Sequence, residues 1–173
     1  VQWEGERVTA VRLAMGAPRF LPTDIPVLAE IEPPVLDFPL EIEGQRLRVS
    51  CLSMGNPHAV LFFAQPVERY PLERMGPAVE HHPSFPQRVN FNVVRVLDRN
   101  RLELRVWERG VGETLACGSG SCAAMVAAHL HNLVEDRVDI SQPGGVLTVD
   151  WDGRGEVYLT GPAEFTFEGD WPG

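Results

Sequence analysis

The chain has 173 residues and a mass of 19.2 kDa, which is enough for one well-packed domain and too little for two full ones. Its 44% hydrophobic and 23% charged residues are typical of a globular protein and exclude a disordered or fibrous one. The net charge of -9 argues against a nucleic-acid partner, because phosphate neutralisation needs a basic surface. No window reaches the ~18 apolar residues of a membrane span, and the first residues lack a signal-peptide pattern. We therefore expect a cytoplasmic protein with no membrane partner.

The basic residues exclude one large class of amino-acid chemistry. All 15 of them are arginine, so no lysine can form a Schiff base with pyridoxal phosphate. Three cysteines, Cys51, Cys117 and Cys122, are odd in number and lack the CxxC spacing of a zinc site. Cys51 lies in a strand pattern and Cys122 in an apolar helical run, so both are expected in the core. The sequence predicts no cofactor, no metal and no disulfide framework.

Apolar or alternating runs predict strands along most of the chain. They cover residues 7–15, 45–53, 58–63, 91–96, 102–107, 137–140, 146–151, 157–160 and 164–167. Turn-forming residues at 98–100, 142–145 and 152–155 separate neighbouring runs. This spacing predicts antiparallel pairing across each turn.

Two segments have helical patterns. Residues 119–133 predict a long helix, and since residues 122–128 are apolar on every face, that helix belongs inside the domain. Residues 70–81 predict a shorter surface helix, interrupted at Gly76 and Pro77, while residues 18–39 form a proline-rich connection without a clear period. The predicted fold class is α+β, with antiparallel strands wrapped around a central helix.

The segment ERGVGETLACGSGSC, residues 108–122, joins a strand end to the start of the long helix. Gly118 and Gly120 allow the backbone to approach a ligand, and the first amides of a helix have no intrahelical partners. Such amides form a cradle for an anion, and the helix dipole lowers the pKa of a thiol placed there. Cys117 is therefore a candidate base or nucleophile. The alternative is that it fills space, as most unpaired cysteines do.

Polar turns supply further candidates. Asn56 and His58 follow one strand, and a histidine can titrate near neutrality. Asn90 and Asn92 share one face of another strand, so one of them could face a site. Taken singly, each of these residues is more often structural than a ligand.

Glu108 and Arg109 form a charged doublet at a strand end, with side chains on opposite sides. A guanidinium suits a carboxylate, and a carboxylate suits an ammonium. The doublet could therefore hold an amino acid, and the alternative is ordinary surface charge.

Three motifs together resemble the signatures of diaminopimelate epimerase in order and spacing: GNPH at 55–58, RVN at 88–90 and ERGVGETLACGSGSCAA at 108–124. The resemblance implies a fold similar to proline racemase. In that fold, two lobes related by a pseudo-twofold axis would each wrap strands around a central helix, with the substrate between them. It also implies cofactor-independent interconversion of LL- and meso-diaminopimelate, on the route to lysine and peptidoglycan.

The resemblance assigns roles to individual residues. Cys117 would be one of two thiols on opposite faces of the substrate α-carbon. Glu108 would contact the substrate amino group and tune that thiol, and His58 would assist the other thiol. The remaining substrate contacts would come from Asn56, Asn90 and Arg109 at the distal end, and from the amides of Gly118 and Ser119 at the reacting carboxylate.

The second thiol has no counterpart here, because neither Cys51 nor Cys122 lies in a glycine-rich turn at a helix start. We therefore expect a C-terminal lobe at residues 17–161. Residues 1–16 would be a crossing strand from an N-terminal lobe, and residues 162–173 a tail returning to it. The expected partners are an amino-acid substrate and that lobe, with a homodimer left open.

The chain by itself is expected to be inactive. Two alternatives remain open: a half-site module that binds without catalysis, and another cofactor-independent isomerase of the same fold. Asn56, Asn90 and Arg109 would discriminate against the second alternative, because only a substrate with a second charged end would use them.

Overall fold

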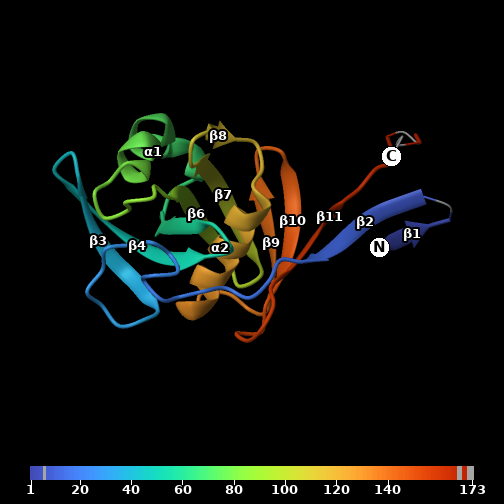
Figure 1. The fold of residues 1–173 in the computed structure, drawn as a ribbon. Coiled ribbons are helices and arrows are strands. Elements are labelled where there is room, and N and C mark those ends of the chain that lie inside the picture. The colour runs from blue at the N-terminus through green and yellow to red at the C-terminus, as the bar shows by residue number, and fades with distance from the viewer. Residues whose placement is uncertain (6, 167–168, 171–173) are drawn as a thin grey trace.

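The computed structural model describes residues 1–5, 7–166 and 169–170 (Figure 1). The strands are β1 (Gln2–Glu4), β2 (Arg7–Ala14), β3 (Val35–Ile42), β4 (Gln45–Ser53), β5 (Pro57–Phe62), β6 (Asn90–Asp98), β7 (Arg101–Glu108), β8 (Gly112–Thr114), β9 (Arg137–Gln142), β10 (Gly145–Asp150) and β11 (Tyr158–Pro162). The helices are the 3-10 turn η1 (Val67–Arg69), α1 (Leu72–Glu80) and α2 (Gly118–Leu130). Neither α-helix is long and apolar enough to cross a membrane within the part of the chain that is described.

The strands form one sheet in the order β1-β2-β11-β10-β9-β7-β6-β5-β4-β3, with β8 paired to β7. The antiparallel pairing predicted across the turns at 98–100, 142–145 and 152–155 is confirmed. Two other pairs, β5 with β6 and β7 with β9, are parallel. Parallel neighbours need a crossover connection, and α1 and α2 lie in these two connections. The α+β class is confirmed, and the sheet is mixed rather than purely antiparallel.

The central strands are buried on both faces. Val60 and Val94 belong to the core around α2, whereas Leu61 and Val93 belong to a second core that includes residues of α1. Because both faces are covered, β5 and the start of β6 are buried without alternation. Figure 1 shows α2 against the middle of the sheet.

The predicted central helix is confirmed as α2, and residues 120–128 are all buried. It ends at Leu130, earlier than the expected 133, because Asn132 adopts a left-handed φ of 56°. The N–H of Asn132 donates to His129 O at 2.9 Å, and the N–H of Leu133 donates to Ala128 O at 3.0 Å. These two bonds form the Schellman motif that terminates a helix.

The interruption expected at Gly76 and Pro77 is wrong, because α1 runs through both residues. Its close contact with β7 explains the glycine: a Cβ at Gly76 would lie 2.4 Å from Cδ2 of Trp107. Glycine in this helix is therefore needed for packing and does not mark a break.

Two strand predictions also need correction. β3 begins inside the segment expected as an irregular connection, and as an edge strand it accommodates Pro39. The strand expected at 164–167 is wrong for residues 164–166, which are irregular, and residue 167 lies outside the described residues. The three-residue strands β1 and β8 were not predicted, because segments this short are too brief to show an apolar or alternating run.

The strands near the two ends of the chain pair with each other. β2 pairs with β11, and β1 folds back along β2, so that these strands lead away from the body of the sheet (Figure 1). Leu13 in this arm is 52% exposed. The arm therefore presents apolar surface beyond the main core.

Candidate active site

The residues singled out by sequence lie at one end of the sheet, where β5, β6, β7 and α2 meet. His58 near the start of β5 pairs with Asn90, the first residue of β6. Trp107 pairs with Phe91, so Glu108 ends β7 at the same edge. The chain returns through β8 to begin α2 at this edge, and the distant motifs are thereby assembled into one site.

Cys117 is the N-cap residue of α2, and its side chain is largely buried with 7% of the residue exposed. Its Sγ accepts a hydrogen bond from the N–H of Gly120 at 3.4 Å and lies 3.6 Å from Ser119 Oγ. The first backbone bond of the helix runs from Ser121 N to Cys117 O, at 2.9 Å. The amides of Gly118 and Ser119 precede it and remain free of intrahelical partners, so an anion could be held beside the sulfur.

The pKa of the Cys117 thiol is raised above its ordinary value, first because of burial and further by the carboxylate of Glu108. Hydrogen bonds from Ser119 and Gly120 oppose this rise without reversing it. The expected lowering of this pKa is therefore wrong for the chain as described. At neutral pH Cys117 carries its proton.

Cys51 and Cys122 are confirmed as core residues, with 1% and 0% exposure. All three cysteines are free thiols. Burial raises the pKa of Cys122 to about 12 and raises that of Cys51 as well. Neither thiol is placed for chemistry at the surface.

Gln142 was missed by sequence reasoning, although it anchors the Cys117 backbone. Its Oε1 accepts from the N–H of Cys117 at 2.9 Å, and its Nε2 donates to Ser121 Oγ at 2.9 Å. Ser121 Oγ in turn donates to Cys117 O at 3.0 Å. No motif marks Gln142, because its contact depends on how β9 packs beside the helix start.

Glu108 and Arg109 occupy separate environments. Glu108 Oε1 accepts from Thr114 Oγ1 across the β7–β8 pair, at 2.6 Å. Arg109 begins the turn after β7, and its Nη1 donates to Gln87 O at 2.9 Å. Glu108 also lies close enough to the Cys117 thiol to raise its pKa, whereas one guanidinium nitrogen of Arg109 is bound to the protein.

Asn90 connects two of the motifs. Its Nδ2 donates to Pro57 O at 2.8 Å, and its Oδ1 accepts from the N–H of Arg109 at 2.9 Å. Both ends of the buried amide therefore hold backbone. The distal substrate contact expected for Asn90 stays a prediction.

His58 is fully buried, and burial is the main reason that its pKa falls to about 3. The expectation that it titrates near neutrality is therefore wrong, and the ring is neutral there. Both ring nitrogens have side-chain partners: Asn56 Oδ1 lies 3.0 Å from Nε2, and Asn92 Nδ2 lies 3.1 Å from Nδ1. Asn92 was noted in the sequence but not assigned to the site.

The glycines at the helix start make room for packing. A Cβ at Gly118 would lie 3.1 Å from Leu159 Cδ2. A Cβ at Gly120 would lie 2.7 Å from Asn92 Oδ1 and 3.2 Å from Cys117 Sγ. The sequence predicted that the backbone at Gly120 would approach a ligand closely. In the structure it is protein atoms that approach Gly120 closely.

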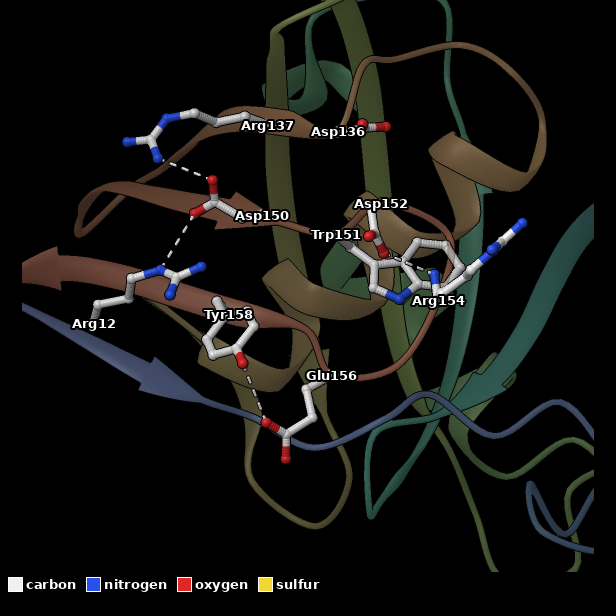
Figure 2. Close-up of a pocket in the computed structure, with 9 residues that line it drawn as sticks. All are labelled: Arg12, Asp136, Arg137, Asp150, Trp151, Asp152, Arg154, Glu156 and Tyr158. Carbon is white, nitrogen blue, oxygen red and sulfur yellow. Dashed lines mark hydrogen bonds and ion pairs between the residues drawn. The ribbon is translucent and has the colours of Figure 1, made fainter.

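A separate polar hollow lies on the side of the sheet formed by β2, β10 and β11 (Figure 2). Arg137 Nη1 lies 2.9 Å from Asp150 Oδ1, and Arg12 Nε lies 3.9 Å from Asp150 Oδ2. Arg12 also stacks over the ring of Tyr158, 3.8 Å from its centroid. Asp150 is thus paired with two arginines within the hollow, and none of the candidate site residues lines it. Among the described residues, no group of three or more histidine, cysteine or acidic side chains is arranged to hold a metal.

The chain has clear relatives. The diaminopimelate epimerase family model matches residues 50–166. The diaminopimelate epimerase of Stutzerimonas stutzeri is 51% identical over 160 residues, which cover 92% of this chain and 57% of that protein. The diaminopimelate epimerase of Moorella thermoacetica is 48% identical over 170 residues, which cover 98% of this chain and 60% of that protein. The chain thus spans less than two thirds of the length of these relatives.

Solved structures with the same fold are more distant in sequence. A hydroxyproline epimerase from Agrobacterium vitis with bound trans-4-hydroxy-L-proline has a TM-score of 0.64 at 18% identity, covering 96% of this chain and 53% of its own. A probable proline racemase from Agrobacterium radiobacter K84 with bound carbonate has a TM-score of 0.62 at 14% identity, covering 96% of this chain and 61% of its own. These likenesses concern the fold. The family match extends over more than half of the sequence, and all three motifs lie within it. The chain therefore belongs to the diaminopimelate epimerase family.

Proposed function

We propose that this chain supplies one half of the active site of a cofactor-independent epimerase that interconverts LL- and meso-diaminopimelate. One observation carries the proposal: the Cys117 thiol caps α2 beside the open amides of Gly118 and Ser119. The relatives named diaminopimelate epimerase support the substrate.

In the proposed reaction, Cys117 faces one side of the substrate α-carbon. Its raised pKa suits the thiol form, which gives its proton to the α-carbon while a base on the opposite face removes one. One S–H bond breaks and one C–H bond forms on this face, so the configuration inverts. In the reverse direction the Cys117 thiolate takes the proton. The amides of Gly118 and Ser119 would stabilise the carboxylate as negative charge develops beside it.

The other contacts follow the family resemblance. Glu108 would bind the substrate ammonium, since its carboxylate lies near the Cys117 sulfur. Arg109, Asn56 and Asn90 would bind the distal end, with the guanidinium pairing with the second carboxylate. His58 would assist the second thiol in the whole enzyme, although in this chain both ring nitrogens have partners.

The opposite face would be covered by an N-terminal lobe, to which residues 1–16 and 162–173 connect, leaving 17–161 as the C-terminal lobe. Leu115, two residues before Cys117, is 71% exposed, and Val111 is 73% exposed. Exposed apolar side chains at the edge of a site are typical of a docking surface. The route to lysine, a cytoplasmic location and a homodimer stay predictions.

Two alternatives predict different behaviour. A half-site module would bind diaminopimelate without exchanging its α-proton. Another amino-acid isomerase of this fold would exchange the α-proton of a substrate that lacks a second charged end. The identity of about one half to diaminopimelate epimerases favours the proposed substrate over that of the second alternative, whereas proton exchange distinguishes the proposal from the first.

The test combines this chain with the N-terminal lobe of the Moorella thermoacetica relative, in D2O with LL-diaminopimelate. We expect formation of the meso isomer with deuterium at the inverted centre, and none from the chain alone. Cys117→Ala should abolish the reaction. Cys122→Ala, the same change five residues away in the buried helix, is the control for folding and should retain it. Epimerisation by the Cys117→Ala variant would contradict the proposal.

A further inference from the structure

Five polar side chains form a continuous line of hydrogen bonds from the interior of the sheet to the candidate thiol. In order, Asn92 Nδ2 lies 3.1 Å from His58 Nδ1, His58 Nε2 lies 3.0 Å from Asn56 Oδ1, Asn56 Nδ2 lies 3.3 Å from Ser119 Oγ, and Ser119 Oγ lies 3.6 Å from Cys117 Sγ. The direction in which these bonds are donated depends on which ring nitrogen of His58 carries the proton.

The surroundings of Asn92 settle that direction. Its Nδ2 also lies 3.3 Å from Ala59 O and 3.4 Å from Asn90 O, and backbone carbonyls only accept. The amide nitrogen, and not the oxygen, therefore faces His58 Nδ1, and we infer that one of its two hydrogens is donated there. A neutral imidazole that accepts at Nδ1 carries its proton on Nε2.

The rest of the line follows from that proton. His58 Nε2–H donates to Asn56 Oδ1, so the nitrogen of Asn56 faces Ser119 and donates to its Oγ. The hydroxyl proton of Ser119 is then free to be donated to Cys117 Sγ. A donor at the sulfur stabilises the thiolate and lowers the thiol pKa, which is the direction of the Ser119 contribution.

The oxygen of the Asn92 side chain shows that an amide at this position is not explained by packing alone. It is fully buried, and its Oδ1 has no hydrogen-bond partner among the described residues. That oxygen faces Gly120, where an added Cβ would lie 2.7 Å away. An unpartnered buried oxygen destabilises the fold, so shape alone would favour an apolar side chain at this position.

We propose that Asn92 is a positioning residue that holds His58 in the Nε2–H tautomer and so directs the line of hydrogen bonds toward the sulfur of Cys117. It touches neither substrate nor the reacting atoms and acts only through His58, Asn56 and Ser119. The inference rests on the proposed function for its catalytic meaning, because the stabilised thiolate is the form of Cys117 that removes a proton.

Two substitutions test the proposal. Asn92→Leu removes the donor to His58 Nδ1 with little change of volume. Asn92→Asp replaces the donor by an acceptor, which requires a proton on Nδ1 and reverses the line. Ser119 must then donate to Asn56 and no longer to the sulfur. Asn100→Asp adds the same charge at an exposed turn and is the matched control.

The first readout is the tautomer of His58, measured by ¹⁵N NMR on this chain without substrate. We expect Nε2–H in the unsubstituted chain and in Asn100→Asp, the neutral Nδ1–H tautomer in Asn92→Asp, and loss of the pure Nε2–H form in Asn92→Leu. A proton on Nδ1 in the unsubstituted chain would overturn the proposal, even if both variants failed to fold.

The second readout is the pH dependence of Cys117 alkylation. A rise of about half a pH unit in the thiol pKa lowers the thiolate fraction about threefold below that pKa. We expect at least this slowing in both Asn92 variants and none in Asn100→Asp. Unchanged alkylation in a folded variant would show that Asn92 only fills the core.

Both readouts are independent of epimerase activity, so the two hypotheses fail separately. If the tautomer and alkylation respond as expected while the assembled lobes do not epimerise, the proposed function fails and the role of Asn92 stands. If the assembled Asn92→Asp enzyme keeps the full rate in the direction where Cys117 is the base, the role of Asn92 fails.

Discussion

Oε1 of Glu80 accepts a hydrogen bond of 2.9 Å from the backbone N–H of Gly110, in the turn that directly follows Glu108 and Arg109. The other oxygen of the same carboxylate accepts from Trp107 Nε1 at 2.7 Å. The carboxylate is only 4% exposed, and its cationic neighbour Arg88 lies 3.6 Å away. Glu80 therefore supports the end of β7 and the turn that follows it.

We predict that Glu80→Gln destabilises the chain. The amide keeps one acceptor but turns an NH2 group toward a backbone donor, which leaves a buried donor unpaired. The expected loss is about 1–3 kcal/mol of unfolding free energy. Urea denaturation checks it, with Glu73→Gln on the exposed face of α1 as the control, which should change stability by less than ~0.5 kcal/mol. Equal effects of the two variants would show that the carboxylate at Glu80 does not hold the turn.

Acid should weaken the fold first through His58. Its pKa is lowered to about 3 in the folded chain, from 6.5, so the unfolded chain binds one more proton between these values. The contribution of neutral His58 to the free energy of unfolding is therefore fully present above about pH 6.5 and is lost as pH falls toward 3. The slope is at most ~1.4 kcal/mol per pH unit for one proton.

Denaturation measured at several pH values between 5 and 6.5 separates the pH dependence of stability due to His58 from that due to Glu80. The pKa of Glu80 is lowered from 4.5: burial would raise it, but donors from Trp107 and Gly110 and neighbouring charges outweigh burial. Its contribution is thus lost only as pH falls below that range. His58→Gln should flatten the slope between pH 5 and 6.5, and an unchanged slope would assign it to other groups.

The residues of the candidate site could be proposed from the sequence because each motif is a short contiguous segment. Cys117, Gly118 and Ser119 are neighbours in the chain, and the turn residues around them identify a helix start before any tertiary structure is known. β4 was also predicted with its observed bounds, Gln45–Ser53, since apolar and polar residues alternate from Leu47 to Cys51 and a glycine-containing turn follows the segment.

The supporting residues could not be found in this way. Glu80, Gln142 and Asn92 reach the site from three different elements, and their contacts depend on the packing of α1, β9 and β6 around it. The pKa of Cys117 was missed for the same reason. The helix start was visible in the sequence, whereas the burial and the Glu108 carboxylate that oppose it are tertiary features.

Thiol labelling should distinguish the three cysteines. Cys117 is 7% exposed, whereas Cys51 and Cys122 are 1% and 0% exposed. Because burial also raises the pKa of all three thiols, labelling should be slow near neutrality and faster at about pH 8.5. Mass spectrometry of the alkylated, folded chain should find Cys117 modified well before the other two. Equal labelling of the three cysteines would mean that they react only after the chain unfolds. A denatured sample provides the labelling pattern of the unfolded chain for comparison.

The last prediction concerns the packing of the two glycines at the start of α2. Alanine is intrinsically better than glycine in a helix by ~1 kcal/mol, so propensity alone would make both Gly118→Ala and Gly120→Ala stabilising. At Gly120 the new Cβ would lie 2.7 Å from the Asn92 oxygen and 3.2 Å from Cys117 Sγ, and the Asn92 amide is fully buried and hydrogen-bonded through its nitrogen.

At Gly118 the nearest atom is the flexible end of Leu159, at 3.1 Å. We therefore expect Gly120→Ala to lose about 1–3 kcal/mol, as overpacked cores do, and Gly118→Ala to change stability by much less. Thermal unfolding compares the two variants with the unsubstituted chain. The order should also appear in Cys117 alkylation, because only the Cβ at Gly120 pushes against the sulfur and against Asn92. If Gly120→Ala were as stable as Gly118→Ala, the close approach of the Asn92 oxygen to the helix start would be wrong.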